Sequence, residues 1–184
     1  MSWKISIGQL ELRQFGMEDA RELYCIRNHE SVRRFMARQE LIPYRSHLAW
    51  VKENLVGDGG LVLLLVRKRP SQRAVGFTQL RVQGEVGEIG VMFREPERHR
   101  IAAAVATAAT LHLGFCWLGL SEVVSYVVPS YEAAAQFNRA WGGVDVPSDR
   151  AGLIKLALAR ERCLSNPNYL RVMGRVTGEM RIES

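Results

Sequence analysis

Three consecutive basic residues, Arg98, His99 and Arg100, stand directly before a long alanine-rich run that ends near Trp117. This run has no proline and no glycine before Gly114, so we expect a helix that begins beside the basic residues. A helix start carries unpaired backbone N–H groups and the positive end of the helix dipole. With the cationic side chains beside it, this start would suit a phosphate or pyrophosphate group. The alternative is a basic turn that is only exposed to water.

The elements that must position this turn follow from the hydrophobic pattern. Alternating or apolar runs bounded by turn residues predict strands at Gln9–Phe15, Leu61–Arg67, Ala74–Val82, Glu85–Phe93, Glu122–Val128 and Gly152–Arg160. Helical spacing predicts a helix from Glu18 to about Ile26, a short one near Ser31, His47–Leu55 capped by Ser46, and Tyr131–Trp141 capped by Ser130. Short turns join the second, third and fourth strands into an antiparallel meander. A strand–helix–strand succession then follows, so we expect a mixed α/β sheet with helices on both faces.

Length, charge and cysteine spacing limit the classes of protein to which the chain could belong. The 184 residues suit one domain, 1–184, with a poorly predicted tail at Asn166–Ser184. The net charge of +6 would suit an anionic ligand, an anionic membrane surface or nucleic acid, but no nucleic-acid motif accompanies the scattered basic residues. No apolar run reaches the roughly 18 residues of a membrane span. The three cysteines lack metal spacing, so we expect a reduced cytoplasmic protein without a metal site.

Several segments, taken in this order, resemble the GNAT N-acetyltransferases from about Leu10 to Arg160. The resemblance is carried by Glu88–Phe93 (EIGVMF) before a proline turn, Leu118–Leu120 (LGL) before the fifth strand, and Pro129–Gly142 (PSYEAAAQFNRAWG). Within that superfamily, Ile26–His29 (IRNH) and the later His47–Val51 (HLAWV) are similar to the UDP-4-amino-sugar N-acetyltransferases of pseudaminic acid synthesis. Ribosomal-protein N-acetyltransferases share the fold. The resemblance implies a GNAT-type, mostly antiparallel sheet of about seven strands, an acetyl-CoA donor and an amine acceptor.

The same resemblance assigns catalytic roles on the strand Glu85–Phe93. The acceptor amine must lose a proton before it attacks the thioester, and Glu88 stands where the family places that base, with Glu85 as the fallback. A backbone N–H of Val91 or Met92 would meet the thioester oxygen. For the cofactor itself, the family's pyrophosphate loop falls on Arg98, His99, Arg100, Ile101, Ala102 and Ala103.

For the acceptor, the resemblance points to Arg27, Asn28 and His47. A nucleotide-linked sugar carries a pyrophosphate, and the planar guanidinium of Arg27 could donate two hydrogen bonds to it. His47, near a helix start, could donate to the same group. The alternatives are structural: Arg27 complements a helix C-terminus, Asn28 caps that helix, and His47 is a polar residue at a helix start.

The chain departs from the family pattern at three positions. Ile101 replaces the first glycine of the pyrophosphate loop, Tyr131 replaces an asparagine, and Asn138 replaces the tyrosine that protonates the leaving thiol. Three functions therefore stay open. One is an acetyl-CoA-dependent N-acetyltransferase for an amino group of a nucleotide-linked, UDP-type sugar; another acts on protein N-termini or other small amines; the third is a GNAT-fold binding protein without turnover. The sequence does not fix the assembly, and a homodimer is allowed.

Overall fold

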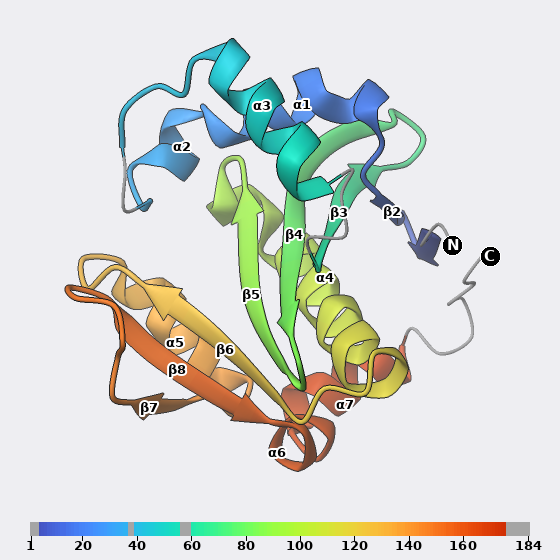
Figure 1. The fold of residues 1–184 in the computed structure, drawn as a ribbon. Coiled ribbons are helices and arrows are strands. Elements are labelled where there is room, and N and C mark those ends of the chain that lie inside the picture. The colour runs from blue at the N-terminus through green and yellow to red at the C-terminus, as the bar shows by residue number, and fades with distance from the viewer. Residues whose placement is uncertain (1–3, 37–38, 56–59, 176–184) are drawn as a thin grey trace.

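The computed structural model describes residues 4–36, 39–55 and 60–175, and one eight-stranded sheet organises them (Figure 1). Along the sheet the strand order is β1-β2-β3-β4-β5-β6-β8-β7. The strands are β1 Lys4–Ile7, β2 Leu10–Gln14, β3 Leu61–Lys68, β4 Arg73–Gln83, β5 Val86–Phe93, β6 Glu122–Val127, β7 Val144–Val146 and β8 Ile154–Ala159. Neighbours are antiparallel except β5 and β6, which run parallel. The expected mixed, mostly antiparallel GNAT-type sheet is confirmed, with eight strands against about seven expected.

Helices cover both faces of this sheet, as the sequence predicts (Figure 1). They are α1 Ala20–Arg27, α2 Glu30–Arg33, α3 Tyr44–Leu55, α4 Arg100–His112, α5 Glu132–Ala140, α6 Arg160–Leu164 and α7 Pro167–Gly174. Short turns of 3₁₀ helix precede α1 (η1, Met17–Asp19) and α4 (η2, Pro96–His99). The apolar strand β3 is covered on both sides: Leu64 packs in the cluster beneath α4, and Leu65 packs against α1 and α3.

Helix α4 lies close to the sheet because its inner face is made of small residues. Ala102, Ala106 and Ala109 recur at helical spacing and pack in one buried cluster with strands β2 to β5. The Thr110 hydroxyl hydrogen-bonds to the Thr78 hydroxyl at 2.7 Å, so a buried polar contact also ties α4 to β4. A π-helical turn, η3 (Leu113–Trp117), continues α4 to its end.

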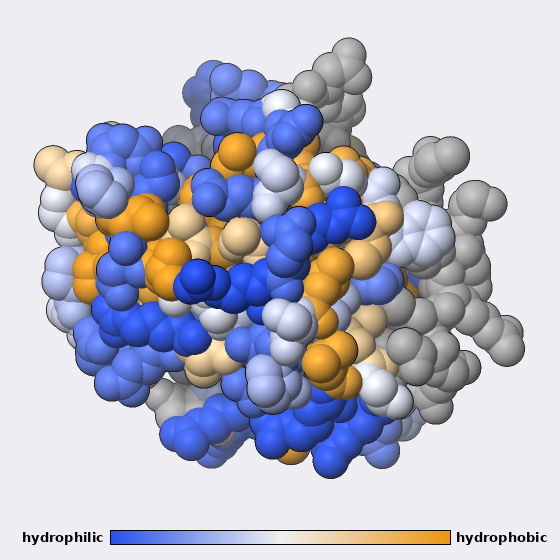
Figure 2. All heavy atoms as spheres, turned by 90° about the horizontal axis from the view of Figure 1, so that it is seen from below, coloured by the Kyte–Doolittle hydropathy of each residue, from blue (hydrophilic) through white to orange (hydrophobic). Residues whose placement is uncertain are grey.

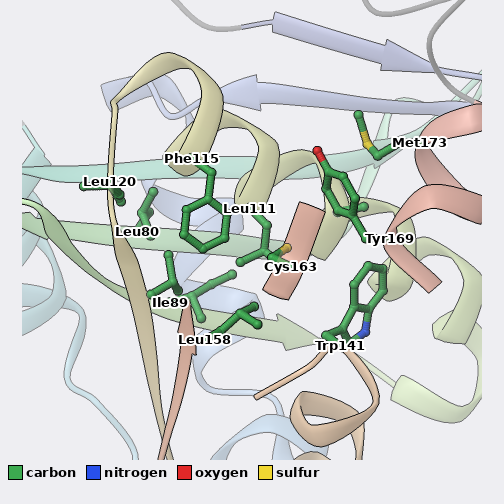
Figure 3. Close-up of a cluster of buried hydrophobic side chains, with 12 residues drawn as sticks. Leu80, Ile89, Leu111, Phe115, Leu120, Trp141, Leu158, Cys163, Tyr169 and Met173 are labelled. Carbon is green, nitrogen blue, oxygen red and sulfur yellow. The ribbon is translucent and has the colours of Figure 1, made fainter. Parts of the chain in front are cut away.

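A second buried cluster joins the two halves of the sheet at the place where β5 meets β6 (Figure 3). Ile89 of β5 and Leu158 of β8 meet there, together with Trp141, which follows α5. Tyr169 and Met173 of α7 close the cluster (Figure 3). The tail that the sequence left poorly predicted therefore begins with a helix that completes the core, while residues 176–184 lie outside the described residues.

Some local predictions were wrong at element ends. Helix α3 begins at Tyr44, so Ser46 lies inside its first turn and does not cap it. Helix α5 begins at Glu132 with Tyr131 as its N-cap residue, so Ser130 does not cap it either. Strands β1 and β7 were not predicted.

The surface at the α6 and α7 end mixes apolar and hydrophilic side chains (Figure 2). Trp117 and Leu170 are among the exposed large apolar residues of the described chain. One helical stretch, Arg100–Trp117, is long and apolar enough to cross a membrane by length and composition, contrary to the sequence-based expectation of no such run. Here 56% of it is buried inside the protein, as in the core helix of a folded domain.

Candidate active site

The sheet opens into a cleft between β5 and β6. These strands pair only at Val86↔Glu122, Gly87↔Val123 and Glu88↔Val124, and beyond that point they diverge (Figure 1). From Ile89 to Phe93, the edge of β5 that faces β6 has no strand partner. Its backbone groups there are therefore free to bind a ligand. A small cavity of about 20 Å³ lies in the cleft, lined by residues of β5, β6, β8, α4 and the α5 region: Ile89, Val91, Thr107, Leu111, Val123, Ser125, Asn138, Trp141, Gly143, Leu156 and Leu158.

The register of β4 and β5 decides which backbone N–H groups face this cleft. The N–H of Arg94 donates to the carbonyl of Val75 at 3.0 Å, and these residues continue the β4–β5 register. In an antiparallel pair, hydrogen-bonded positions alternate along each strand. The N–H of Met92 therefore points to β4, whereas the N–H of Val91 points into the cleft. Of the two oxyanion donors considered from the sequence, the geometry favours Val91.

Glu88 lies at the fork itself, at the last paired position of β5. Its side chain lies on the sheet face of α1 and α3, because Met92, four residues further along the strand, packs against the buried cluster that contains Leu23 of α1 and Val51 of α3. Both carboxylate oxygens accept hydrogen bonds from Arg150, at 2.8 and 2.6 Å. Arg150 was not predicted from the sequence, because it lies 62 residues away in the β7–β8 loop. A carboxylate has about four acceptor positions, so this pair leaves room for a further proton donor.

Arg150 belongs to a larger polar network over the same side of the cleft. Its guanidinium lies 3.8 Å from the centre of the Tyr126 ring, and the Tyr126 hydroxyl donates to Asp149 at 2.7 Å. Lys155 also pairs with Asp149 at 3.0 Å. Hydrogen bonds from Tyr126 and Lys155 lower the pKa of Asp149 to about 2, so this carboxylate is ionised at neutral pH. The pKa of Tyr126 is raised, by desolvation and by its bond to Asp149, so the phenol keeps its proton.

The predicted cofactor residues surround the start of α4. The side chain of Arg98 is exposed and pairs with Glu95 at 2.9 Å, and Arg100 is exposed as well. The Ile101 side chain is 81% exposed and therefore does not crowd the turn. Ala102 is buried and Ala103 is partly buried, and both pack toward the sheet. The first-turn N–H groups of α4 lack helical acceptors, as at every helix start, so they could bind a phosphate.

The predicted acceptor residues have structural partners. His47 has no exposed surface, and its Nε2 lies 2.8 Å from the carbonyl oxygen of Ala20. Arg27 lies 3.4 Å from His47 Nδ1 and 4.2 Å from the centre of the Trp50 ring. The Asn28 side chain bonds both the N–H and the carbonyl of Ile42, at 2.8 and 3.1 Å. Acceptor binding by these three residues stays a prediction, and their contacts fit the structural alternatives.

These contacts predict a pH dependence of stability. Burial first, and then the Arg27 charge, lower the pKa of His47; its Nδ1 faces the guanidinium and its Nε2–H donates to Ala20. The unfolded chain therefore binds more protons than the folded chain once the pH falls to about 6.5, and the free energy of unfolding should fall below that pH.

We expect the melting temperature of the wild type to drop between about pH 7.5 and pH 5.5, and to drop less in His47→Gln. The remaining drop in the variant would come from His112 and His99, because burial also lowers the pKa of each. An equal drop in both proteins would contradict the assignment to His47.

The other two residues that depart from the family pattern, Tyr131 and Asn138, make defined contacts in the structure. Tyr131 stacks on Phe35 with ring centroids 3.5 Å apart and an interplanar angle of 9°, which ties the end of α2 to the start of α5. Asn138 lines the cleft, and its Nδ2 donates to the carbonyl of Ala134 at 2.8 Å. The cleft thus has an amide at the position where the sequence resemblance expects the family's tyrosine.

The sequence of the chain matches a known protein family. The family model of the acetyltransferase (GNAT) domain matches residues 9–143. The chain belongs to the GNAT acetyltransferase family. It is accordingly an N-acetyltransferase, and the GNAT family uses acetyl-CoA as its acetyl donor. No curated protein sequence matches it significantly.

Solved structures share the GNAT fold with this chain. The spermidine N-acetyltransferase from Vibrio cholerae, in complex with CoA and spermine, has a TM-score of 0.74 and 14% sequence identity over 85% of this chain and 99% of that one. A GNAT-family acetyltransferase from Bacillus anthracis has a TM-score of 0.66 and 17% identity over 86% of this chain and 99% of that one. At such identities the likeness concerns the fold. A specific similarity of this GNAT chain to UDP-amino-sugar or ribosomal-protein enzymes is not shown.

Proposed function

We propose that the protein transfers an acetyl group from acetyl-CoA to the amino group of a nucleotide-linked amino sugar, with Glu88 as the base. The observation that carries the proposal is the position of Glu88 at the fork of β5 and β6. The Val91 N–H points into the same cleft, so a proton acceptor and a hydrogen-bond donor converge where the strands part. The reaction takes place in the cytoplasm, where the three free cysteines stay reduced.

In this mechanism the residues of the chain have separate tasks. The first turn of α4, with Arg98, His99 and Arg100 beside it, holds the phosphates of the donor. The Val91 N–H donates to the thioester oxygen, and Glu88 accepts the proton that the amine loses as its nitrogen bonds to the acetyl carbon. The carbon–sulfur bond breaks and the sulfur leaves as thiolate. Because an ordinary thiol has a pKa of only about 8.5, the thiolate can leave although Asn138 has no proton to give.

The charges beside Glu88 support an anionic acceptor. Arg150 forms an ion pair with Glu88, and Lys155 forms an ion pair with Asp149 in the same network. Because Glu88 and Asp149 balance these two cations, a polycationic amine would find no surplus of negative charge there, whereas the phosphates of an acceptor could accept hydrogen bonds from Arg150 and Lys155. Since Arg27 and His47 contact each other inside the fold, Arg150 and Lys155 are the better candidates for the acceptor phosphates.

A small polycationic amine is the second candidate acceptor, because the structural likeness includes a spermidine N-acetyltransferase. We predict that the rate of CoA release, measured with a thiol reagent, gives a kcat/KM at least about tenfold higher for a UDP-linked amino sugar than for spermidine. Tenfold corresponds to about 1.4 kcal/mol, about the size of one charge-assisted hydrogen bond between an acceptor phosphate and Arg150 or Lys155. A higher kcat/KM for spermidine, or for a peptide with a free N-terminus, would replace the proposed acceptor class. Absence of turnover with every amine would favour a binding protein.

A further inference from the structure

We propose that a second pocket, between the β3–β4 hairpin and the β5–α4 turn, binds a phosphate group. Its volume is about 320 Å³, and its lining comes from three segments that are distant in sequence: His29, Lys68, Ser71, Arg73, Val75, Arg94, Glu95, Arg98 and His99. It shares no lining residue with the cleft between β5 and β6. Arg98 and His99 also flank the α4 start that the proposed function assigns to the donor phosphates, but the site requires no acetyl transfer, so it can be tested apart from that function.

The lining is strongly cationic. Lys68, Arg73, Arg94 and Arg98 carry permanent charges, and Glu95 is the single carboxylate among the lining residues. Glu95 already pairs with Arg98 at 2.9 Å, so it does little to offset the other three cations. A pocket with this surplus attracts anions, and low-dielectric walls strengthen that field.

Two of the cations are placed directly opposite each other. Lys68 and Arg73 form the last pair of the β3–β4 ladder. Like charges at such a position destabilise a sheet, and in the described part of the chain neither residue has an ion-pair partner. An anion held between them would remove this repulsion. The arrangement is therefore costly when empty and favourable when a phosphate is bound.

Hydrogen bonds fix the shape of the rest of the pocket, and its side chains keep further hydrogen-bonding groups for a ligand. Arg94 Nη2 donates to the carbonyl of Ala74 at 2.5 Å, and the Glu95 N–H donates to the Ser31 hydroxyl at 3.0 Å. His99 Nδ1 is buried without a hydrogen-bond partner in the described structure, which is a cost that bound ligands commonly relieve. The positive charge of Lys68 also lowers the pKa of His99, after desolvation, and a bound anion would reverse that second effect.

The lining also indicates which part of a ligand is recognised. No phenylalanine, tyrosine or tryptophan lines the pocket, so it offers no large ring on which a nucleobase could stack. Arginine and lysine side chains suit phosphoryl oxygens. The phosphate could belong to the acetyl donor, reaching over the α4 start, or to a separate phosphorylated molecule, and these two sources can be distinguished experimentally.

The test is calorimetric titration of the full chain with inorganic pyrophosphate at constant ionic strength. We expect saturable binding that Arg73→Gln weakens at least about tenfold, the effect of losing one charge-assisted hydrogen bond. Lys68→Gln should weaken it similarly, which guards against a folding defect in one variant. Arg162→Gln removes the same charge from exposed α6 at the other end of the sheet and should change the Kd less than about twofold (Figure 1).

Two results would overturn the site: no saturable binding, or equal weakening by Arg162→Gln and Arg73→Gln, which would indicate only a diffuse attraction to net charge. A competition arm identifies the source of the phosphate. If acetyl-CoA displaces pyrophosphate from the wild type, the donor fills the pocket. If both bind together, the pocket serves a separate phosphorylated ligand; either result supports the site.

Discussion

Replacing Glu88 by glutamine is expected to lower kcat/KM for amine acetylation by about 10²–10⁴-fold at neutral pH, the usual contribution of a general base. Glutamine keeps the size of the side chain, and its carbonyl oxygen can still accept a hydrogen bond from Arg150. It cannot take a proton from the amine. Since Glu88 is only partly buried and its replacement leaves the fold contacts in place, the melting temperature should change by no more than about 2 °C.

The pH dependence separates a base from a structural role. In Glu88→Gln the rate should recover as the pH rises, because more of the acceptor amine is then already deprotonated. Glu85→Gln is the matched control: Glu85 is exposed in the turn before β5, and its backbone carbonyl, which the substitution keeps, accepts from Ser121. Its kcat/KM should stay within about twofold of wild type. Activity of Glu88→Gln close to wild type, or a loss that parallels unfolding, would refute the assignment.

The sequence predicted the parts of the fold that local patterns determine. Short turns between alternating runs specify the meander, and the alanine-rich run after Pro96 specifies α4. The short edge strands Lys4–Ile7 and Val144–Val146 were not predicted. Four or three residues give almost no periodic signal, and such strands form only by pairing with a neighbouring strand. Helix α7 was missed for a similar reason, since its apolar residues are placed by packing against α4, Trp141 and Leu158, which are distant in sequence.

In the candidate site, residue type and sequence position alone did not predict which side chains contact each other. The strand that carries Glu88 could be located from its pattern, whereas its partner Arg150 could not, because loop contacts across 62 residues leave no spacing rule. For His47 the residue type suggested binding chemistry, but helix α3 directs it inward, to Ala20 and Arg27. The choice between Val91 and Met92 needed the strand register, which only the paired structure supplies.

The second large effect concerns the carboxylate that fastens α1, the helix carrying Arg27 and Asn28, to the sheet. Asp19 is 3% exposed and accepts hydrogen bonds from Arg13 at 2.5 Å, Arg67 at 2.9 Å and the Gly16 N–H at 2.9 Å. These contacts join the start of α1 to β2 and β3. Removing one partner of a buried ion pair costs several kcal/mol, because the remaining charge keeps its desolvation penalty.

We therefore expect Asp19→Asn to lower the free energy of unfolding by about 3 kcal/mol, the low end for buried pairs, because Glu22 still contacts Arg67. For a chain of this size that is a drop in melting temperature of roughly 6–12 °C. Asp145→Asn is the control: its pair with Arg139 is exposed, and the melting temperature should hardly move. Equal shifts in the two variants, measured by scanning calorimetry, would show that burial of Asp19 does not set the cost, and that α1 is fastened to the sheet by its apolar face alone.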